Sequence, residues 1–121
     1  MNRYQYIDLE YITEMADGDV VFVIEMINDY KTKIPEYIAD LNKAASDRNT
    51  DEVKFYAHKL ASSFMMMGAK QLNEIALKIE HNVKGSMAIE QLPAELRKMD
   101  ELFMNVQKEL DEELKLLNAS N

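Results

Sequence analysis

Hydrophobic residues recur along most of the chain at alternating steps of three and four, the spacing that keeps one apolar stripe on an α-helix. The clearest stripe consists of Val23, Ile27, Tyr30, Ile34, Tyr37 and Leu41. Asp19 precedes this stripe and is a suitable N-cap, because its side chain can accept an amide hydrogen of the first helical turn. Pro35 falls inside the stripe and should remove one backbone hydrogen bond and bend the helix.

A second stripe predicts a helix that begins near Asn49 or Thr50 and ends at Gly68. Both starting residues have side-chain oxygens that can accept unpaired amide hydrogens. Gly68 comes directly after the last apolar position, where a residue that is free to adopt a left-handed conformation typically closes a helix. The apolar positions of this helix are Ala57, Leu60, Phe64 and Met67.

Three further segments have the same helical spacing. A short helix before Asp17 and Gly18 has the apolar positions Leu9, Ile12 and Ala16. The helix after Gly68 has Gly85 as its expected stop and the apolar positions Leu72, Ile75, Ala76, Ile79 and Val83. The last helix begins near Pro93, precedes a polar tail at residues 118–121, and has the apolar positions Leu96, Met99, Phe103, Val106, Leu110, Leu114 and Leu117.

Composition supports an all-α protein, because 3 glycines and 2 prolines in 121 residues leave long uninterrupted stretches of helix-forming residues. Amphipathic helices joined by short turns can bury their stripes only against one another. The sequence therefore predicts an antiparallel four-helix bundle with an additional short N-terminal helix, as a single domain over residues 1–121. A bundle of this size can bury its stripes alone, which favours a monomer.

Charge and composition exclude several classes of function. The 14 basic and 22 acidic residues give a net charge of -8, which disfavours binding to nucleic acid or to an anionic membrane surface. No apolar run is long enough to cross a membrane, and the N-terminus has no secretion signal, so we expect a cytoplasmic protein. The absence of cysteine excludes thiolate zinc sites and cysteine nucleophiles.

His58 is the residue that does not fit the core pattern. It lies two residues before Leu60, and at about 100° per residue its ring should point roughly 160° away from the buried stripe. A neutral imidazole nitrogen can attack a phosphoryl group, and nearby cations stabilise the product. An ordinary exposed surface histidine is the alternative that spacing alone leaves open. The same side of the helix should carry Lys54, Ala61, Ser62 and Met65, with Lys59 about a quarter turn away.

Other candidate sites have simpler explanations. His81 lies near the expected end of a helix, where a cation is favourable for structural reasons alone. A metal site that pairs His58 with His81 would need carboxylates at helical spacing around them, and none is centred on either, so no metal is predicted. The acidic run from Glu109 to Glu113 is most simply a solvated helix face. Met67 and Met99 lie on buried stripes and should fill the core.

The stretch Ala57-His58-Lys59-Leu60-Ala61-Ser62-Ser63-Phe64-Met65-Met66-Met67-Gly68 resembles the motif of histidine-containing phosphotransfer (Hpt) domains. The segments 22–41, with Pro35, and 69–80 are similar to the helices that flank this motif in the family. The resemblance implies that His58 accepts the phosphoryl group and that Gly68 closes its helix.

The sequence departs from the family motif at two positions. It has Ala61 and Ser62 where the family usually has lysine and glycine, so Lys59 or Lys54 would supply the missing charge. The resemblance also implies a surface on which a receiver domain docks, formed here by Ala61, Ser62, Met65 and Met66.

The function implied by the resemblance is that of a carrier and not an enzyme. His58 would relay a phosphoryl group between receiver-domain aspartates in a multistep relay fed by a hybrid sensor histidine kinase. The chain would need no cofactor of its own, since the receiver supplies magnesium. Two alternatives remain open: a helical adaptor that docks a receiver or kinase without taking phosphate, and a structural adaptor whose last helix pairs with another chain.

Overall fold

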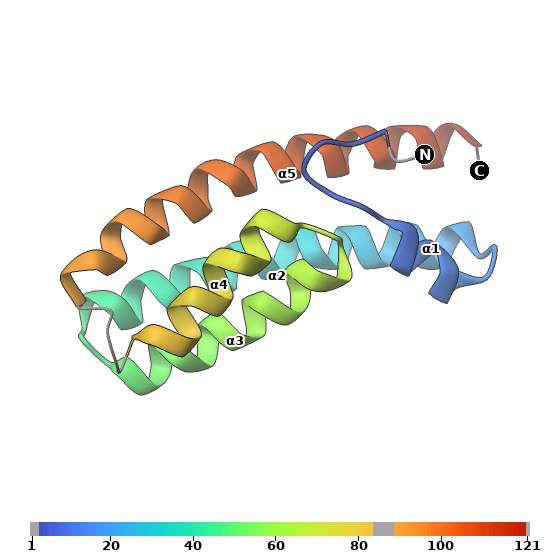
Figure 1. Cartoon of the computed structure of the whole chain (residues 1–121). Helices are drawn as coiled ribbons and strands as arrows, with labels where there is room; N and C mark the ends of the chain where they lie inside the picture. Colours follow the sequence, from blue (N-terminus) through green and yellow to red (C-terminus); the bar gives the residue numbers. More distant parts are fainter. Residues whose placement is uncertain (1–2, 84–88, 121) are drawn as a thin grey trace.

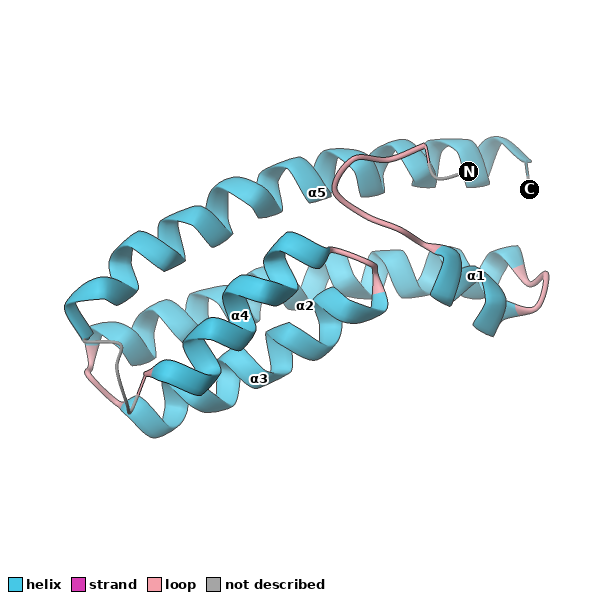
Figure 2. Ribbon diagram, in the orientation of Figure 1, coloured by secondary structure: helices cyan, strands magenta, loops and turns pink. Residues whose placement is uncertain are grey.

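A computed structural model describes residues 3–83 and 89–120 of the chain. Helices account for almost all of this part, and it contains no strand (Figure 2). The elements in chain order are α1 (Glu10–Ala16), α2 (Val20–Ser46), α3 (Thr50–Met66), α4 (Lys70–Asn82), the short 3-10 helix η1 (Ile89–Gln91) and α5 (Leu92–Ser120).

Helices α2, α3, α4 and α5 run in alternating directions and form an antiparallel bundle, with α1 added at the end where both termini lie (Figure 1). Helix α3 packs against α2 and α4, and α5 packs against the same two helices from the other side. The predicted fold class is therefore confirmed, including the short N-terminal helix. Helix α3 has its main contacts with α2 and α4, and its remaining side, which includes Lys54, His58 and Ser62, is exposed to solvent.

The core consists mostly of the apolar stripes that the sequence predicts, but five predicted stripe residues are only half-buried: Ala16, Tyr37, Ile75, Leu114 and Leu117. Ile38 is buried at 8% exposure, whereas Tyr37 is only half-buried at the edge of the stripe. A step of four from the buried Ile34 leads to Ile38, so the stripe continues along the i, i+4 direction at this point. The helix continues through Pro35 without interruption. Met67 and Met99 are fully buried, as expected for core residues.

Local side-chain and backbone bonds set the helix ends. The Asp19 side chain accepts a hydrogen bond from Phe22 N at 3.1 Å, and the Asn49 side chain accepts one from Glu52 N at 3.1 Å. Asn49, and not Thr50, is therefore the N-cap of α3. At the other end of α3, the backbone turns at Gly68 with a φ of 68°.

The turn at Gly68 closes the end of α3 with two backbone hydrogen bonds. Gly68 N donates to Met65 O at 3.1 Å, and Ala69 N donates to Phe64 O at 2.9 Å. This pattern is a Schellman motif, in which a left-handed residue pairs the last carbonyl groups of a helix. The prediction that Gly68 closes this helix is confirmed.

The C-terminal ends of α5 and α4 bear differently on the sequence prediction. Helix α5 continues through Asn118 to Ser120, so the polar tail predicted for residues 118–121 is helical over the described part of it. These residues include neither glycine nor proline, and polarity alone does not end a helix. Helix α4 ends at Asn82, and the predicted stop Gly85 lies outside the described residues.

The first residues of the described chain form an N-terminal strap, residues 3–9, that runs from the C-terminal half of α5 down to α1 (Figure 1). The Glu109 carboxylate accepts hydrogen bonds from the backbone N–H groups of Gln5 at 2.9 Å, Tyr6 at 2.8 Å and Ile7 at 3.2 Å. The Tyr4 hydroxyl donates to Glu113 Oε1 at 2.5 Å. The interpretation of this acidic run as a purely solvated face was therefore wrong for Glu109 and Glu113.

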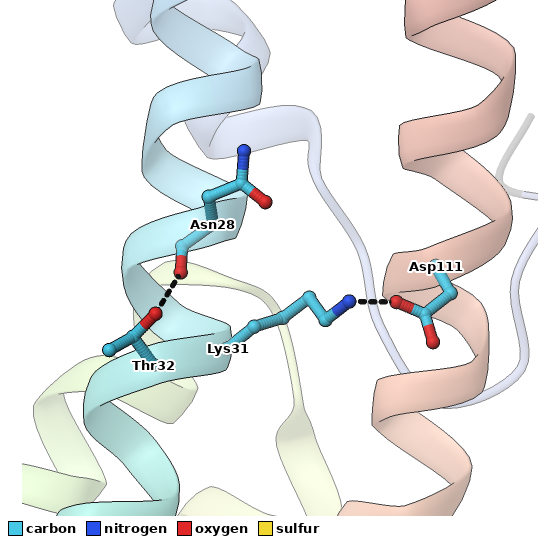
Figure 3. Close-up of polar contacts among 4 residues, drawn as sticks. All are labelled: Asn28, Lys31, Thr32 and Asp111. Carbon is cyan, nitrogen blue, oxygen red and sulfur yellow. Dashed lines mark hydrogen bonds and ion pairs between the residues drawn. The ribbon is translucent and has the colours of Figure 1, made fainter.

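Ion pairs connect α5 to its two neighbours. Lys31 of α2 pairs with Asp111 of α5, next to a hydrogen bond from the Thr32 hydroxyl to Asn28 O (Figure 3). Lys78 Nζ of α4 lies 2.9 Å from Glu95 Oε1 of α5, and Glu95 is buried at 8% exposure. None of the described helices combines the length and the apolar character needed to cross a membrane.

Candidate functional site

His58 lies in the middle of α3 on its open side. Its side chain is 68% exposed, whereas Ala57 and Leu60 beside it are both 0% exposed. The angular argument from the sequence is therefore confirmed: the imidazole faces solvent while its neighbours hold the helix in the core. A backbone fixed on both sides by buried residues gives this ring a rigid base.

Glu80 of α4 determines how the ring is oriented. Its Oε2 lies 2.8 Å from His58 Nδ1, and the Glu80 side chain is only 15% exposed. A carboxylate can only accept, so Nδ1 carries the hydrogen and the neutral ring has its free lone pair on Nε2. The outer nitrogen, Nε2, is thus the nucleophilic atom presented to solvent.

The second oxygen of Glu80 is unusual. Glu80 Oε1 is buried and has no hydrogen-bond partner among the residues that the structure describes. The carboxylate therefore bonds His58 through Oε2, while Oε1 is enclosed where α3 packs against α4. Among the described residues, His58 is therefore the one hydrogen-bond partner of the Glu80 side chain, which suits a group that positions the ring.

The sequence reasoning missed Glu80 as a site residue, although a signal was available. His58 and Glu80 lie 22 residues apart, at similar distances on either side of the turn at Gly68. Residues placed in this way on two antiparallel helices lie opposite each other. A search along the helical hairpin, instead of along one helix, would have found the pair.

Two lysines lie near His58 in the sequence, but their surroundings differ. Lys59 Nζ lies 5.3 Å from the centroid of the Tyr37 ring and 5.0 Å from that of Phe55, so two cation–π contacts hold it between α2 and α3. Lys54 is exposed one turn before His58 and forms no ion pair with any described residue. Lys54 is therefore the freer of the two cations.

Ala61 does not lie on the surface, contrary to the sequence prediction. It is only 4% exposed, and its carbonyl oxygen accepts a hydrogen bond from Asn73 Nδ2 of α4 at 2.8 Å. Its position is about 60° from His58 around the helix, on the side where α4 packs. The burial of Ala61 removes it from the predicted docking surface.

The other predicted docking residues are exposed to different degrees. Ser62 is exposed, and Met65 is 67% exposed. Met66 is half-buried and packs against the core, so only part of it is accessible. The accessible surface after His58 therefore depends on Ser62 and Met65.

His81 is exposed in the last turn of α4, next in sequence to Glu80. Within residues 3–83 and 89–120, no group of three or more histidine, aspartate or glutamate side chains is arranged to hold a metal ion. The chemistry that the described residues offer is thus that of one exposed, oriented imidazole with nearby lysines.

Comparison with known families agrees with this geometry. The family model of the Hpt domain matches residues 25–120. The chain belongs to the Hpt domain family. Hpt domains take part in histidine phosphotransfer in two-component signalling, and they interact with receiver domains and kinases. Neither the comparison with curated proteins nor that with solved structures finds a match.

The matched region contains His58, Glu80 and the whole of α3, α4 and α5. It begins inside α2, so the N-terminal strap and α1 lie outside it. The strap packs at the end of α3, where Asp8 N donates a hydrogen bond to Met67 O at 3.0 Å.

Proposed function

We propose that this Hpt domain carries a phosphoryl group on His58 Nε2 between receiver-domain aspartates in a multistep two-component phosphorelay. The observation that supports this function most strongly is the exposed imidazole whose Nδ1 is hydrogen-bonded to Glu80 at 2.8 Å. This bond leaves Nε2 unprotonated and directed at solvent in the neutral ring.

The transfer step follows from this geometry. The lone pair of Nε2 attacks the phosphorus of an aspartyl phosphate, so that an N–P bond forms as the acyl O–P bond breaks. The receiver's aspartate leaves as a carboxylate, and the reverse reaction passes the group to a second receiver. The ring keeps its Nδ1 hydrogen throughout and becomes positively charged, and the Glu80 carboxylate stabilises that charge.

This Hpt domain provides the positioned imidazole and nearby positive charge, and the receiver provides the other groups that the transfer needs. The receiver supplies the magnesium ion, so this Hpt domain needs no cofactor and is a carrier instead of an enzyme. Lys54 and Lys59 supply positive charge near the phosphoryl oxygens, and the short Ser62 side chain leaves room for the approaching domain. In-line transfer of this kind depends mainly on positioning and electrostatics.

The proposed partners are receiver domains and a hybrid sensor kinase, with the monomer as the working form. The net charge of -8 argues against nucleic acid as a partner.

The decisive experiment measures phosphate transfer from a phosphorylated receiver to this protein. We expect an acid-labile phosphate on the wild type and none on His58→Gln. Failure of every receiver from the same organism to transfer would contradict the proposal.

Variants of Glu80 test the role of the ring orientation. Glu80→Ala removes a hydrogen bond to a charged group, worth about 1.5–3 kcal/mol, so we expect transfer to slow by about tenfold to a hundredfold. Glu80→Gln can still accept from Nδ1 and should slow it less. Glu74→Gln, an exposed position on the same helix, is the control and should transfer normally.

An adaptor that binds a receiver without taking phosphate is the second candidate. The observation in its favour is Ala61, which is buried at the position where the family motif has lysine. Receiver binding by the wild type without any label on His58 would select this function.

A further inference from the structure

We propose that Met65 is a redox modification site, at which hydrogen peroxide oxidises the thioether to a sulfoxide and thereby weakens the docking of a receiver domain on His58. The sulfoxide is reduced again by a thiol-dependent reductase, so the modification is reversible. This inference rests on the proposed function, because it concerns how transfer through the same site is regulated.

Three consecutive methionines at the end of α3 differ in exposure. Met65 is 67% exposed, Met66 is half-buried and Met67 is 0% exposed. Met65 also lines two hollows, one shared with α1 and one shared with α4, so solvent reaches its side chain from both sides. A dissolved oxidant therefore meets Met65 first, and the close packing of the core protects Met67.

The sulfur chemistry of the chain is confined to thioethers. The 121 residues include 9 methionines and no cysteine, so no thiol of the chain competes for the oxidant or forms a disulfide. Oxidation to the sulfoxide converts a flexible apolar side chain into a polar one and disrupts surfaces that use methionine for contact. Met65 is thus a position where a small chemical change alters the character of an exposed surface.

The modification step is the transfer of one oxygen atom. A lone pair of the Met65 sulfur attacks a peroxide oxygen, so that an S–O bond forms as the O–O bond breaks. The departing hydroxide takes the proton of the transferred hydroxyl group and leaves as water. The thioether loses two electrons and the peroxide gains them. In the reverse direction, the thiols of a methionine sulfoxide reductase return two electrons, and the oxygen leaves as water.

Met65 lies where a domain that docks on His58 covers it. It comes seven residues after His58, which is close to two full turns, so the two side chains share one face of α3 about 10 Å apart along its axis. A standard interface buries about 800 Å² on each partner, which corresponds to a disc of about 16 Å radius. A receiver centred on the imidazole therefore buries Met65.

Burial of a sulfoxide is less favourable than burial of a thioether. The apolar Met65 side chain gains free energy when it is covered, whereas a sulfoxide oxygen must give up its hydrogen bonds to water. The reacting imidazole is two turns away and keeps its bond to Glu80 at 2.8 Å. We therefore expect oxidation to weaken docking about tenfold and to leave the chemistry of the ring unchanged.

The test treats the wild type with hydrogen peroxide, locates the added oxygen by peptide mass spectrometry, and measures transfer from a receiver phosphorylated with acetyl phosphate. We expect Met65 to be oxidised well before Met67, and kcat/KM to fall about tenfold through KM. Treatment with methionine sulfoxide reductases should restore transfer. Met65→Gln, which places a polar oxygen on the same surface, should lower kcat/KM without any oxidant.

Two leucine variants are the matched controls, because leucine has nearly the volume of methionine and has no sulfur. Met65→Leu, compared with its own untreated form, should keep its kcat/KM after treatment. Met104→Leu removes a methionine of similar exposure, 61%, from α5, so its treated form should lose transfer as the wild type does.

Labelling of His58 by phosphoramidate separates a change in docking from damage to the ring. The treated wild type should be labelled at the untreated rate, because this small donor needs no docking surface. Loss of this labelling, full transfer by protein that is oxidised at Met65, or equal loss of transfer in treated Met65→Leu would each overturn Met65 as the modification site. Failure of the untreated wild type to accept phosphate from any receiver would instead overturn the proposed function.

Discussion

Glu109 offers the sharpest test of how the N-terminal strap is held. Its carboxylate accepts three backbone hydrogen bonds, from Gln5 at 2.9 Å, Tyr6 at 2.8 Å and Ile7 at 3.2 Å. The change Glu109→Ala removes all three hydrogen bonds at once. It leaves the helix propensity of α5 at least as high, because alanine is the best helix former.

The magnitude follows from the burial of each donor. The Gln5 N–H is exposed, so water replaces its partner at little cost. The Tyr6 and Ile7 N–H groups are part-buried and share one carboxylate oxygen, so their loss counts as fewer than two independent charged bonds of about 1.5–3 kcal/mol each. We therefore expect the free energy of unfolding to fall by about 2–4 kcal/mol, which lowers Tm by about 10 °C.

Urea unfolding followed by circular dichroism measures this loss, with Glu101→Ala as the control. Glu101 is an exposed residue of α5, so its removal should change the free energy of unfolding by less than about 0.5 kcal/mol. Hydrogen exchange gives a local readout, since the amides of Tyr6 and Ile7 should be protected in the wild type and should lose protection in Glu109→Ala. Equal stability of the two variants, together with unprotected amides in the wild type, would refute the strap as described.

Two further predictions concern stability. Gly68→Ala should destabilise the protein by more than about 2 kcal/mol, because the φ of 68° is left-handed and the new Cβ would clash with the backbone of Asp8. The control is Gly18→Ala, which has a φ of 89° but open space around it and should cost only about 1 kcal/mol in the same thermal melts. Tyr30 is buried without a hydroxyl partner among the described residues, and burial raises its pKa from 10.0 to about 12. The folded state thus favours neutral Tyr30, a contribution that is complete below pH 10 and lost as the pH rises through 12. Tyr30→Phe should therefore equal or exceed the wild-type stability at pH 7, and its free energy of unfolding should fall less between pH 10 and pH 12 than that of the wild type. Titrations of the unfolding free energy against pH that coincide for the two proteins would contradict this.

The fold could be predicted in detail because its determinants are local or periodic. Apolar stripes at steps of three and four identified the buried faces, and Asp19, Asn49 and Gly68 marked helix ends through bonds within a few residues. The N-terminal strap had no such signal. Its backbone bonds to Glu109 join residues more than 100 positions apart, so only the assembled bundle brings them together.

The site could be predicted only as far as one helix allows. The angle from Leu60 gave the exposure of His58 correctly, because burial of one face fixes the opposite face. The same reasoning failed for Ala61, which lies near the boundary between the two faces. Whether such a position is open depends on where the neighbouring helix packs, and α4 covers it here.

Phosphorus NMR of the protein after labelling by a phosphorylated receiver tests the central claim most directly. The account predicts one phosphohistidine resonance of the Nε2 isomer, present in the wild type and absent in His58→Gln. A resonance of the Nδ1 isomer, or one that persists in His58→Gln, would contradict the account.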